Sequence, residues 1–203
     1  MHSSQHQRSR EVDSGIRLPE RARFQAALVL LMISGLTGCH GTGAAVTPAG
    51  RSSMELTSSS FRDGRLPNEF TCDGAGRSPQ LAWAAPPATA RSLALIVTDP
   101  DAPVGTFVHW VLFNVPAAQR ELPAALPTLE QLPDGSRQGR NDFGNIGYGG
   151  PCPPGHSTHR YIFDLYALDA TLNLQPGATR KQVEAAMQGH ILSRGEVIWR
   201  YSR

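Results

Sequence analysis

Two separated segments hold the residues best suited to chemistry. The first reads Asp99-Pro-Asp-Ala-Pro103 and is followed by His109-Trp110, and the second runs from Gly147 to Tyr161. Each sets carboxylates or imidazoles beside Pro and Gly backbone that ordinary helices and strands exclude. Each also borders a strongly apolar, β-like run. We therefore predict that the two segments meet in one anion-binding pocket.

Glycine, histidine and tyrosine supply the donors that an anion needs. Gly149, Gly150 and Gly155 allow backbone N–H groups to converge in a nest that binds phosphate or carboxylate oxygens. Ionised aspartates repel a phosphate, so we expect them to orient His109 or His159, or to accept from a ligand ammonium or hydroxyl. A zwitterionic headgroup would satisfy both. One histidine at a strand end is usually a satisfied structural group, and only the combination favours a site.

Apolar runs predict the strands that must position these residues. Leu93–Val97 is continuous and indicates a buried strand, whereas Phe107–Val115 and Tyr161–Leu168 alternate and are rich in β-favouring residues. Pro116–Asp142 has little periodicity and is longer than most connections. That connection is either a lid beside the pocket or a passive crossover.

One helix is predicted near the end of the chain. Thr179 and Gln182 fit a capping box, and apolar residues repeat at helical spacing through Thr179–Ile191. Gly195 fits the helix stop, and Val197–Tyr201 can return as a last strand. Many strands and a late helix favour a mainly β sandwich with the helix at one end.

The alternation of side chains in a strand assigns the histidines to faces. It places His159 and Tyr161 on one face of their strand, and His109 on the same face as Val111 and Phe113. We thus expect both histidines at the ends of core-facing rows, where a pocket can open beside hydrophobic packing.

The N-terminal region reads as a lipoprotein signal. Arg21 and Arg23 precede the apolar stretch Phe24–Gly35, which is shorter than the ~20 residues that a spanning helix needs. Leu36-Thr-Gly-Cys39 resembles the bacterial lipobox, so we expect cleavage after residue 38 and lipidation of Cys39. Residues 39–54 read as a flexible tether, and 55–203 as a single domain. His40 after the cysteine favours the outer membrane, facing the periplasm, if the source is Gram-negative.

The charge balance argues against nucleic acid as a partner. The chain has 203 residues, of which 40% are hydrophobic and 18% charged. Removing residues 1–38 takes five of the 19 basic and three of the 17 acidic residues, which leaves 14 of each. The mature chain is therefore formally neutral, with no basic stripe.

Cys72 and Cys152 are the other cysteines of the mature chain. In an oxidising compartment such a pair often becomes a disulfide. Two alternatives stay open. The residues could be buried thiols that act as small hydrophobes, or Cys152, inside the Gly/Pro segment, could bring thiol chemistry to the pocket.

Taken together, these residues resemble the phosphatidylethanolamine-binding protein (PEBP) family, in particular its bacterial Raf-kinase-inhibitor-like branch. The resemblance covers nearly all of residues 55–203, and two of its motifs are long and specific. In chain order the motifs are Phe70-Thr-Cys-Asp-Gly74, Ser78-Pro79, Leu81-Ala-Trp83, Thr98-Asp-Pro-Asp-Ala-Pro103, His109-Trp110, Asn114, Gly147 to Gly155, His159-Arg-Tyr161 and Gly189-His-Ile191.

The resemblance implies a sandwich of a large and a small antiparallel sheet with C-terminal helices, and a shallow pocket for phosphate-like anions. The chain departs from the family at Trp199, where glycine is expected, and at Ser157, where a small, glycine-like residue is common. Ser157 is expected to narrow the pocket rim. The implied ligand-binding residues are Asp99, Asp101, His109, Gly149, Pro151, His159 and Tyr161.

The leading hypothesis is a non-enzymatic, lipid-anchored envelope protein that recognises a phosphorylated small molecule or phospholipid headgroup, without cofactor or metal. One alternative is an inhibitor or interaction protein for an envelope enzyme, working through Pro116–Asp142. Another is a metal-dependent hydrolase, although no His-Glu-x-x-His motif occurs. Serine chemistry lacks a Gly-x-Ser-x-Gly motif. The candidate metal ligands are Asp99, His109, Cys152, His156 and His159.

The lipobox makes a direct prediction. Cys39→Ser should abolish lipidation and leave unprocessed or soluble protein, because the acyl acceptor is the cysteine thiol. Metabolic labelling with radioactive palmitate measures the outcome. Label that still enters the mutant would refute the assignment.

Overall fold

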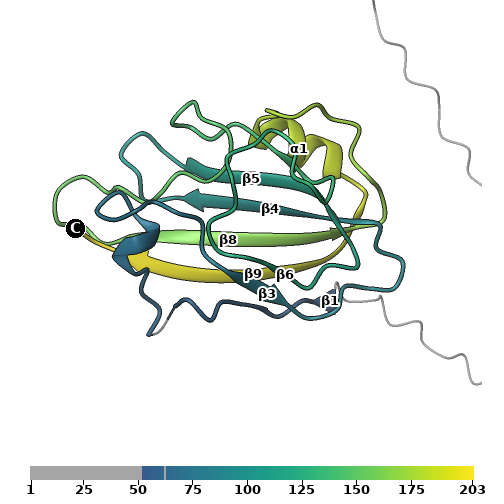
Figure 1. Ribbon diagram of the computed structural model, residues 1–203, viewed down its shortest axis with the longest axis horizontal. Coiled ribbons are helices and arrows are strands. Elements are labelled where there is room, and N and C mark those ends of the chain that lie inside the picture. The colour runs from purple at the N-terminus through teal and green to yellow at the C-terminus, as the bar shows by residue number, and fades with distance from the viewer. Residues whose placement is uncertain (1–51, 62) are drawn as a thin grey trace, which may run out of the picture. The chain divides into compact units, whose positions relative to one another are not determined.

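The protein is described by a computed structural model that covers residues 52–61 and 63–203. It contains two sheets, as the sequence predicts, and every strand pair is antiparallel except the first pair in the larger sheet. In spatial order the larger sheet holds β1 (Ser52–Ser53), β9 (Ile191–Tyr201), β8 (His159–Leu168), β4 (Ser92–Asp99), β5 (Phe107–Pro116) and β7 (Arg137–Gln138) (Figure 1). The smaller sheet holds β2 (Leu56–Thr57), β3 (Leu81–Trp83) and β6 (Glu121–Leu122), and the described helices are η1 (Asn68–Phe70) and α1 (Arg180–Met187).

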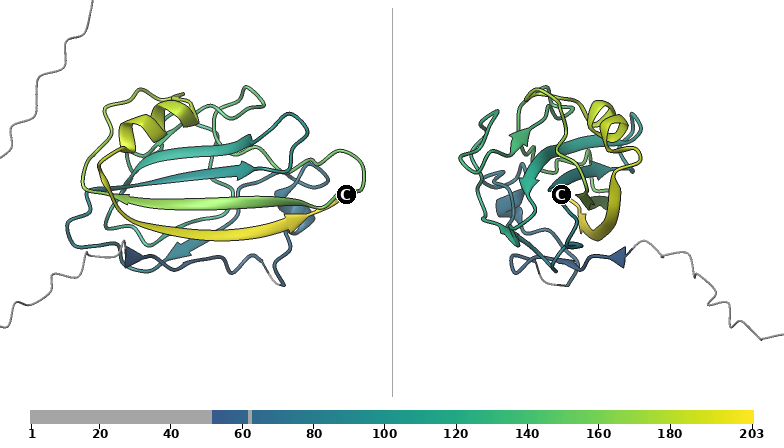
Figure 2. Two further views of the ribbon diagram at one scale, coloured as in Figure 1. Left: turned by 180° about the vertical axis from the view of Figure 1, so that it is seen from behind. Right: turned by 90° about the vertical axis from the view of Figure 1, so that its right-hand side faces the viewer.

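Strand β4 lies between β8 and β5, and all eight of its residues are buried. One of its faces packs with the smaller sheet, and the other packs with α1 (Figure 2). The predicted strands at Leu93–Val97, Phe107–Val115 and Tyr161–Leu168 are confirmed. The cluster on the smaller-sheet side includes Leu56, Leu81, Trp83, Leu93, Leu95, Val97 and Leu122, and that on the helix side includes Ala94, Ile96, Val111, Phe113, Val183 and Met187.

A β-bulge changes the predicted direction of His109. Val97 pairs with Trp110 and Thr98 pairs with Val108, so β5 carries one extra residue, His109, between these pairs. An extra residue interrupts the alternation of faces and re-aims a side chain. The ring of His109 lies 5.2 Å from that of Tyr161, which belongs to the smaller-sheet cluster. The prediction that it shares a face with Val111 and Phe113 is therefore wrong.

The predicted helix is too long at its C-terminal end. The Thr179 capping box is present, but α1 ends at Met187 instead of continuing to residue 191. Gly189 has φ +82°, a left-handed conformation that ends the helix turn. Gly195 is not a stop but lies within β9, where a Cβ atom would stand 2.6 Å from the Met54 carbonyl oxygen. Close approach of two backbones explains that glycine.

The long connection Pro116–Asp142 joins the larger sheet through β7, and the buried Gln138 side chain of that strand holds other parts of the connection in place. The side-chain oxygen Oε1 of Gln138 accepts from Trp110 Nε1 at 2.9 Å. Its amide group donates to the carbonyl oxygens of Pro127 at 2.7 Å and Leu129 at 2.8 Å. A fully bonded buried amide of this kind fixes the conformation of the chain around it.

The signal segment, the lipobox with Cys39 and most of the tether lie outside the described residues. The end of the expected tether is folded, since Ser53 pairs with β9 and the Met54 side chain is buried. Among residues 52–61 and 63–203, no helix combines the length and apolar character that a membrane crossing requires.

Candidate functional site

A pocket opens where β4 ends and where β5 and β8 begin, which is the left-hand end in Figure 1. Its volume is about 180 Å³. Of the seven predicted ligand-binding residues, three line it directly, and the other four surround or support it. The lining residues are Asp99, Ala102, Pro103, Val104, Phe107, His109, Phe143, Cys152, Pro153, Pro154 and His159.

Asp99 and His159 form a buried pair at the base of the pocket. His159 Nδ1 lies 2.7 Å from Asp99 Oδ2, and both side chains are 5% exposed. Because a carboxylate can only accept, Nδ1 carries the proton, and in the neutral ring Nε2 is then an acceptor. The second carboxylate oxygen, Oδ1, accepts from the backbone N–H of Asp101 at 2.8 Å. The aspartate thus orients a histidine, as the sequence predicts.

Asp101 does not line the pocket. Its carboxylate accepts from the Arg160 guanidinium at 2.6 and 2.9 Å and from the Arg160 backbone N–H at 2.9 Å. The Arg160 hydrogen bonds lower the pKa of Asp101 to about 2. Its charge is therefore compensated on the outer face of β8, away from a bound anion.

His109 makes a different hydrogen bond from that of His159. Its Nδ1 lies 2.8 Å from the carbonyl oxygen of Gly149, which can only accept, so this nitrogen carries the proton. Burial lowers the pKa of His109 below its ordinary value, although the Gly149 carbonyl and the Asp99 carboxylate oppose the shift. Burial therefore favours the neutral form of the His109 ring. Its Nε2 takes no part in the hydrogen bond to the Gly149 carbonyl oxygen.

Gly149 does not act as the predicted N–H donor. Its backbone N–H donates to the His109 carbonyl oxygen at 2.8 Å, and its own carbonyl holds the His109 ring. A Cβ at this position would lie 2.5 Å from the Phe143 ring. Gly149 therefore allows close packing against Phe143 and orients the His109 ring. Its N–H is not available to an anion, because it donates to the His109 carbonyl oxygen.

Tyr161 lies behind the histidines. Its side chain is fully buried, and its ring meets that of His109 edge to face. Among the residues that the structure describes, none forms a hydrogen bond with its hydroxyl. Burial, and then the nearby Asp99 carboxylate, raise the pKa of Tyr161 well above its usual range. The hydroxyl therefore stays protonated and can donate.

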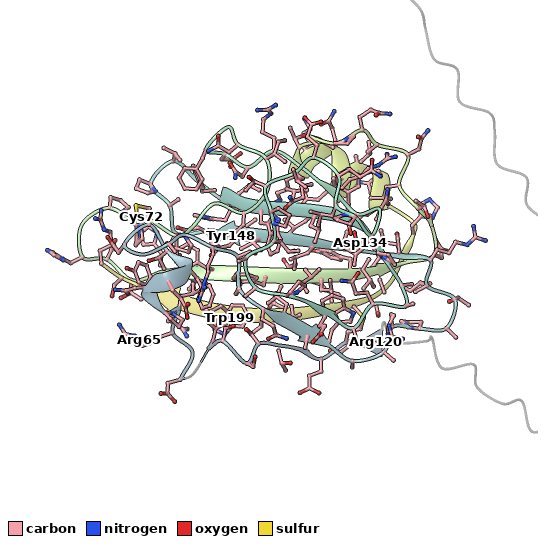
Figure 3. The ribbon with its side chains drawn as sticks, viewed as in Figure 1. Arg65, Cys72, Arg120, Asp134, Tyr148 and Trp199 are labelled. Atoms are coloured by element: carbon pink, nitrogen blue, oxygen red, sulfur yellow. A yellow bond between two sulfur atoms is a disulfide. The ribbon has the colours of Figure 1, made fainter. Side chains whose placement is uncertain are left out.

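A disulfide between Cys72 and Cys152 forms part of the pocket wall, with 5.3 Å between the Cα atoms. The Cys72 N–H also donates to the carbonyl oxygen of Pro151 at 3.0 Å. Figure 3 shows Cys72 at the pocket end of the molecule. Pro151 is thus a buried support of the wall and is not among the lining residues.

Hydrophobic rim residues are what the sequence reasoning missed. Val104 is 85% exposed and Phe143 is 46% exposed, although both line the pocket beside Phe107. Two of them follow the Asp99–Pro103 motif closely, and Phe143 precedes the glycine segment. The sequence signal that could have found them is the presence of large apolar residues in or next to segments expected to be loops.

Ser157, expected to narrow the rim, is exposed and contacts the buried pair. Its Oγ lies 3.0 Å from His159 Nε2 and 3.2 Å from the Pro154 carbonyl oxygen. The hydroxyl therefore bonds to the one ring nitrogen of His159 that Asp99 leaves unused.

The geometry of the pocket bears on the lid expected for residues 116–142 and on the metal ligands suggested by the sequence. No residue of 116–142 lines the pocket, so that connection is not a lid over it. The described part of the chain has no group of three His, Cys, Asp or Glu residues arranged to hold a metal ion. Cys152, one candidate ligand, is in the disulfide.

Comparison with known proteins agrees with this architecture. The family model for phosphatidylethanolamine-binding proteins matches residues 57–202. A UPF0098 protein of Methanothermobacter thermautotrophicus is 50% identical over 151 residues, which cover 74% of this chain and 99% of the relative. A UPF0098 protein of Pyrococcus abyssi is 44% identical over 184 residues, covering 89% and 99%.

Solved structures show the same fold. The crystal structure of a PEBP homologue from Chlamydia trachomatis has a TM-score of 0.67 and 38% identity, covering 74% of this chain and 98% of that one. Escherichia coli YbcL, presented as a new member of the mammalian PEBP family, has a TM-score of 0.69 and 31% identity, covering 75% and 99%.

The fold and the pocket at its end define a two-sheet β protein of the PEBP type. The chain belongs to the phosphatidylethanolamine-binding protein family.

The two aspartates should differ in their effect on stability. Asp99→Asn should lower the free energy of unfolding by about 1.5–3 kcal/mol, because the buried His159 N–H loses a charged acceptor. Asp101→Asn, the matched control, should cost less than about 1 kcal/mol, because its ion pair with Arg160 is partly exposed. Urea denaturation measures both values. Equal losses would contradict the assignment of Asp99 as the buried anchor.

Proposed function

We propose that this protein is a lipid-anchored envelope binding protein whose pocket recognises a phosphate-type anion, either a phospholipid headgroup or a phosphorylated small molecule. The observation that carries the proposal is that Asp99 and Asp101, the two carboxylates of the first motif, are both held by hydrogen-bond donors near the pocket base. Asp99 is paired with His159, and Asp101 with Arg160. The Arg160 guanidinium compensates the charge of Asp101, and the N–H donors that Asp99 accepts from weaken the repulsion between its carboxylate and an anion.

The groups around the cavity can donate hydrogen bonds to an anion once the His109 ring is protonated. His109 Nε2 has no carbonyl partner and becomes a donor when the ring is protonated. His159 lines the same cavity, and the Tyr161 hydroxyl behind it has a proton to donate. Hydrogen bonds between an ionised donor and an anion are about twice as strong as neutral ones.

The size and rim of the pocket favour a headgroup. Its volume of about 180 Å³ is below the ~300–1,000 Å³ of sites for drug-sized ligands, so it fits a small polar group. Val104, Phe107 and Phe143 give the mouth an apolar border. An apolar border suits a ligand whose anionic end enters the pocket while a carbon chain stays at the rim.

The membrane location is part of the same proposal and comes from the sequence. The lipobox at Leu36–Cys39 supports lipidation, and residues following it provide a tether to the folded part. A lipid anchor would hold the pocket near a membrane surface that presents phospholipid headgroups. In a Gram-negative cell we expect the outer membrane, facing the periplasm.

Calorimetric titration of the full chain in detergent micelles tests the ligand class. Phosphate, phosphoethanolamine and glycerophosphoethanolamine should each bind saturably. The double variant His109→Ala/His159→Ala should weaken binding by about 1–3 kcal/mol or more, because charge-assisted hydrogen bonds are lost.

The three ligands also separate the sources of the anion. Preference for glycerophosphoethanolamine indicates a phospholipid headgroup, and equal affinity for phosphate indicates recognition of the phosphate alone. His190→Ala is the matched control, since its ring bonds to Asp169 and is not among the residues that line the pocket. Absence of binding to all three would overturn the proposal and favour a protein-interaction role.

Anion binding should also depend on pH through His109. Its ring faces Asp99, Asp142, His159 and Tyr161, and burial keeps its pKa below the ordinary value. A bound anion favours the protonated ring, so affinity should rise as pH falls. Sulfate, whose charge is constant in this range, should bind roughly 3- to 10-fold tighter at about pH 5.5 than at about pH 7.5.

The variant His109→Gln is the control for this pH dependence. Glutamine retains an N–H for the Gly149 carbonyl but does not titrate, so the change in sulfate affinity between the two pH values should shrink. An unchanged dependence would assign the titrating group to another residue.

A further inference from the structure

Asp99 forms a hydrogen-bonded row at the pocket with two side chains, His159 and Ser157, that lie close together in the sequence but far from it. Asp99 Oδ2 lies 2.7 Å from His159 Nδ1, and His159 Nε2 lies 3.0 Å from Ser157 Oγ. The carboxylate and the imidazole are buried, whereas the serine is exposed. This order of atoms matches the acid, base and nucleophile of serine hydrolases, which are recognised by geometry and not by sequence position.

The protonation of the row agrees with this assignment. The carboxylate fixes the proton of His159 on Nδ1, so Nε2 has a lone pair directed to Ser157. Asp99 is itself held by the Asp101 N–H at 2.8 Å, which keeps the carboxylate in one orientation. The contact of Oγ with Nε2 is shorter than its other contact, 3.2 Å to the Pro154 carbonyl.

We propose that Ser157 is a nucleophile toward activated esters, with His159 as its general base. Asp99 orients the His159 ring and stabilises the protonated ring that forms during the reaction. This inference rests on the same pocket as the proposed function and adds a reaction to it. It applies to this chain because the Ser157 hydroxyl contacts His159 Nε2.

The reaction balances with water as the only co-reactant. Ser157 Oγ attacks the ester carbonyl carbon while its proton passes to His159 Nε2, and the carbon–oxygen bond to the alcohol breaks. The leaving alkoxide takes the proton from Nε2. Water then attacks the acyl-serine, gives a proton to Nε2, and releases the carboxylic acid as that proton returns to Oγ.

The surroundings of Ser157 indicate the substrate class. Ser157 is an exposed residue, and its hydroxyl contacts His159 at a partly buried position beside the pocket. The rim next to His159 is lined by Val104, Phe107 and Phe143, which suits an apolar acyl group. We therefore expect small esters of apolar acids with a good leaving group.

A fluorophosphonate probe tests the nucleophile in the full-length protein. Attack by Oγ forms an oxygen–phosphorus bond and expels fluoride, while the serine proton passes to His159. Peptide mass spectrometry should locate the adduct on Ser157, and Ser157→Ala should remove it. Thr158→Ala, which alters the neighbouring hydroxyl, should leave the labelling rate unchanged.

The role of the buried pair is tested by the rate. Asp99→Asn should slow the labelling of Ser157 by about 100-fold or more, because the base loses the group that fixes its proton. Unfolding the wild-type protein in urea should abolish labelling in the same way, which keeps the test valid if Asp99→Asn does not fold. A Ser157 that is unlabelled in the folded protein, or labelled equally after unfolding, overturns the proposal.

Phosphate titration of the same samples separates this proposal from the proposed function. Phosphate binding without labelled Ser157 would refute the nucleophile and leave the anion site in place. Labelled Ser157 without phosphate binding would refute the anion site and leave the nucleophile.

Discussion

The complete burial of strand β4 is the constraint on which the remaining structure depends. Neither face of this strand meets water, so one side requires the smaller sheet and the other requires α1. Its last residue, Asp99, is 3% exposed. A buried carboxylate without a partner costs several kcal/mol, so His159 and the Asp101 N–H must meet it there. The pocket is the place where the central strand of the sheet becomes polar.

The two histidines are chemically distinct although they share one cavity. A carboxylate holds the Nδ1 proton of His159, whereas a carbonyl holds that of His109. Burial also disfavours charge on the His109 ring, and the Gly149 carbonyl and the Asp99 carboxylate oppose that effect. The pocket can therefore combine two roles. His159 can accept a proton from a hydroxyl, and His109 can gain a proton when an anion binds.

Much of the fold follows from patterns that are local in the sequence. Continuous burial along Leu93–Val97, the alternation after Tyr161 and the Thr179 capping box each depend on neighbouring residues, and each was predictable. The position of Gly195 was not, because its reason is the backbone of Met54, far away in the chain. Strands of two residues, such as β6, carry no periodic signal at all.

The candidate site was predictable in its residue types but not in its geometry. The orientation of a histidine was one of the two roles that charge repulsion suggested for the aspartates, and Asp99 has that role. The bulge at His109 changes the face of that ring, and it depends on the register with β4, which no local pattern records. The direction of Gly149 likewise depends on segments that meet only in the folded chain, whereas Ser157 contacts His159 two residues away through a turn that no periodic pattern records.

The disulfide beside the pocket makes oxidation a step in building the site. Cys72 and Cys152 are 80 residues apart, so the bond closes a loop that contains β4 and β5, and its chain-entropy contribution is about 4–5 kcal/mol. Cys152 also lines the cavity. Protein made where thiols stay reduced would therefore lack both this stabilisation and a fixed pocket wall. The cellular machinery that oxidises thiols thus helps to decide how much of the protein made has a finished pocket.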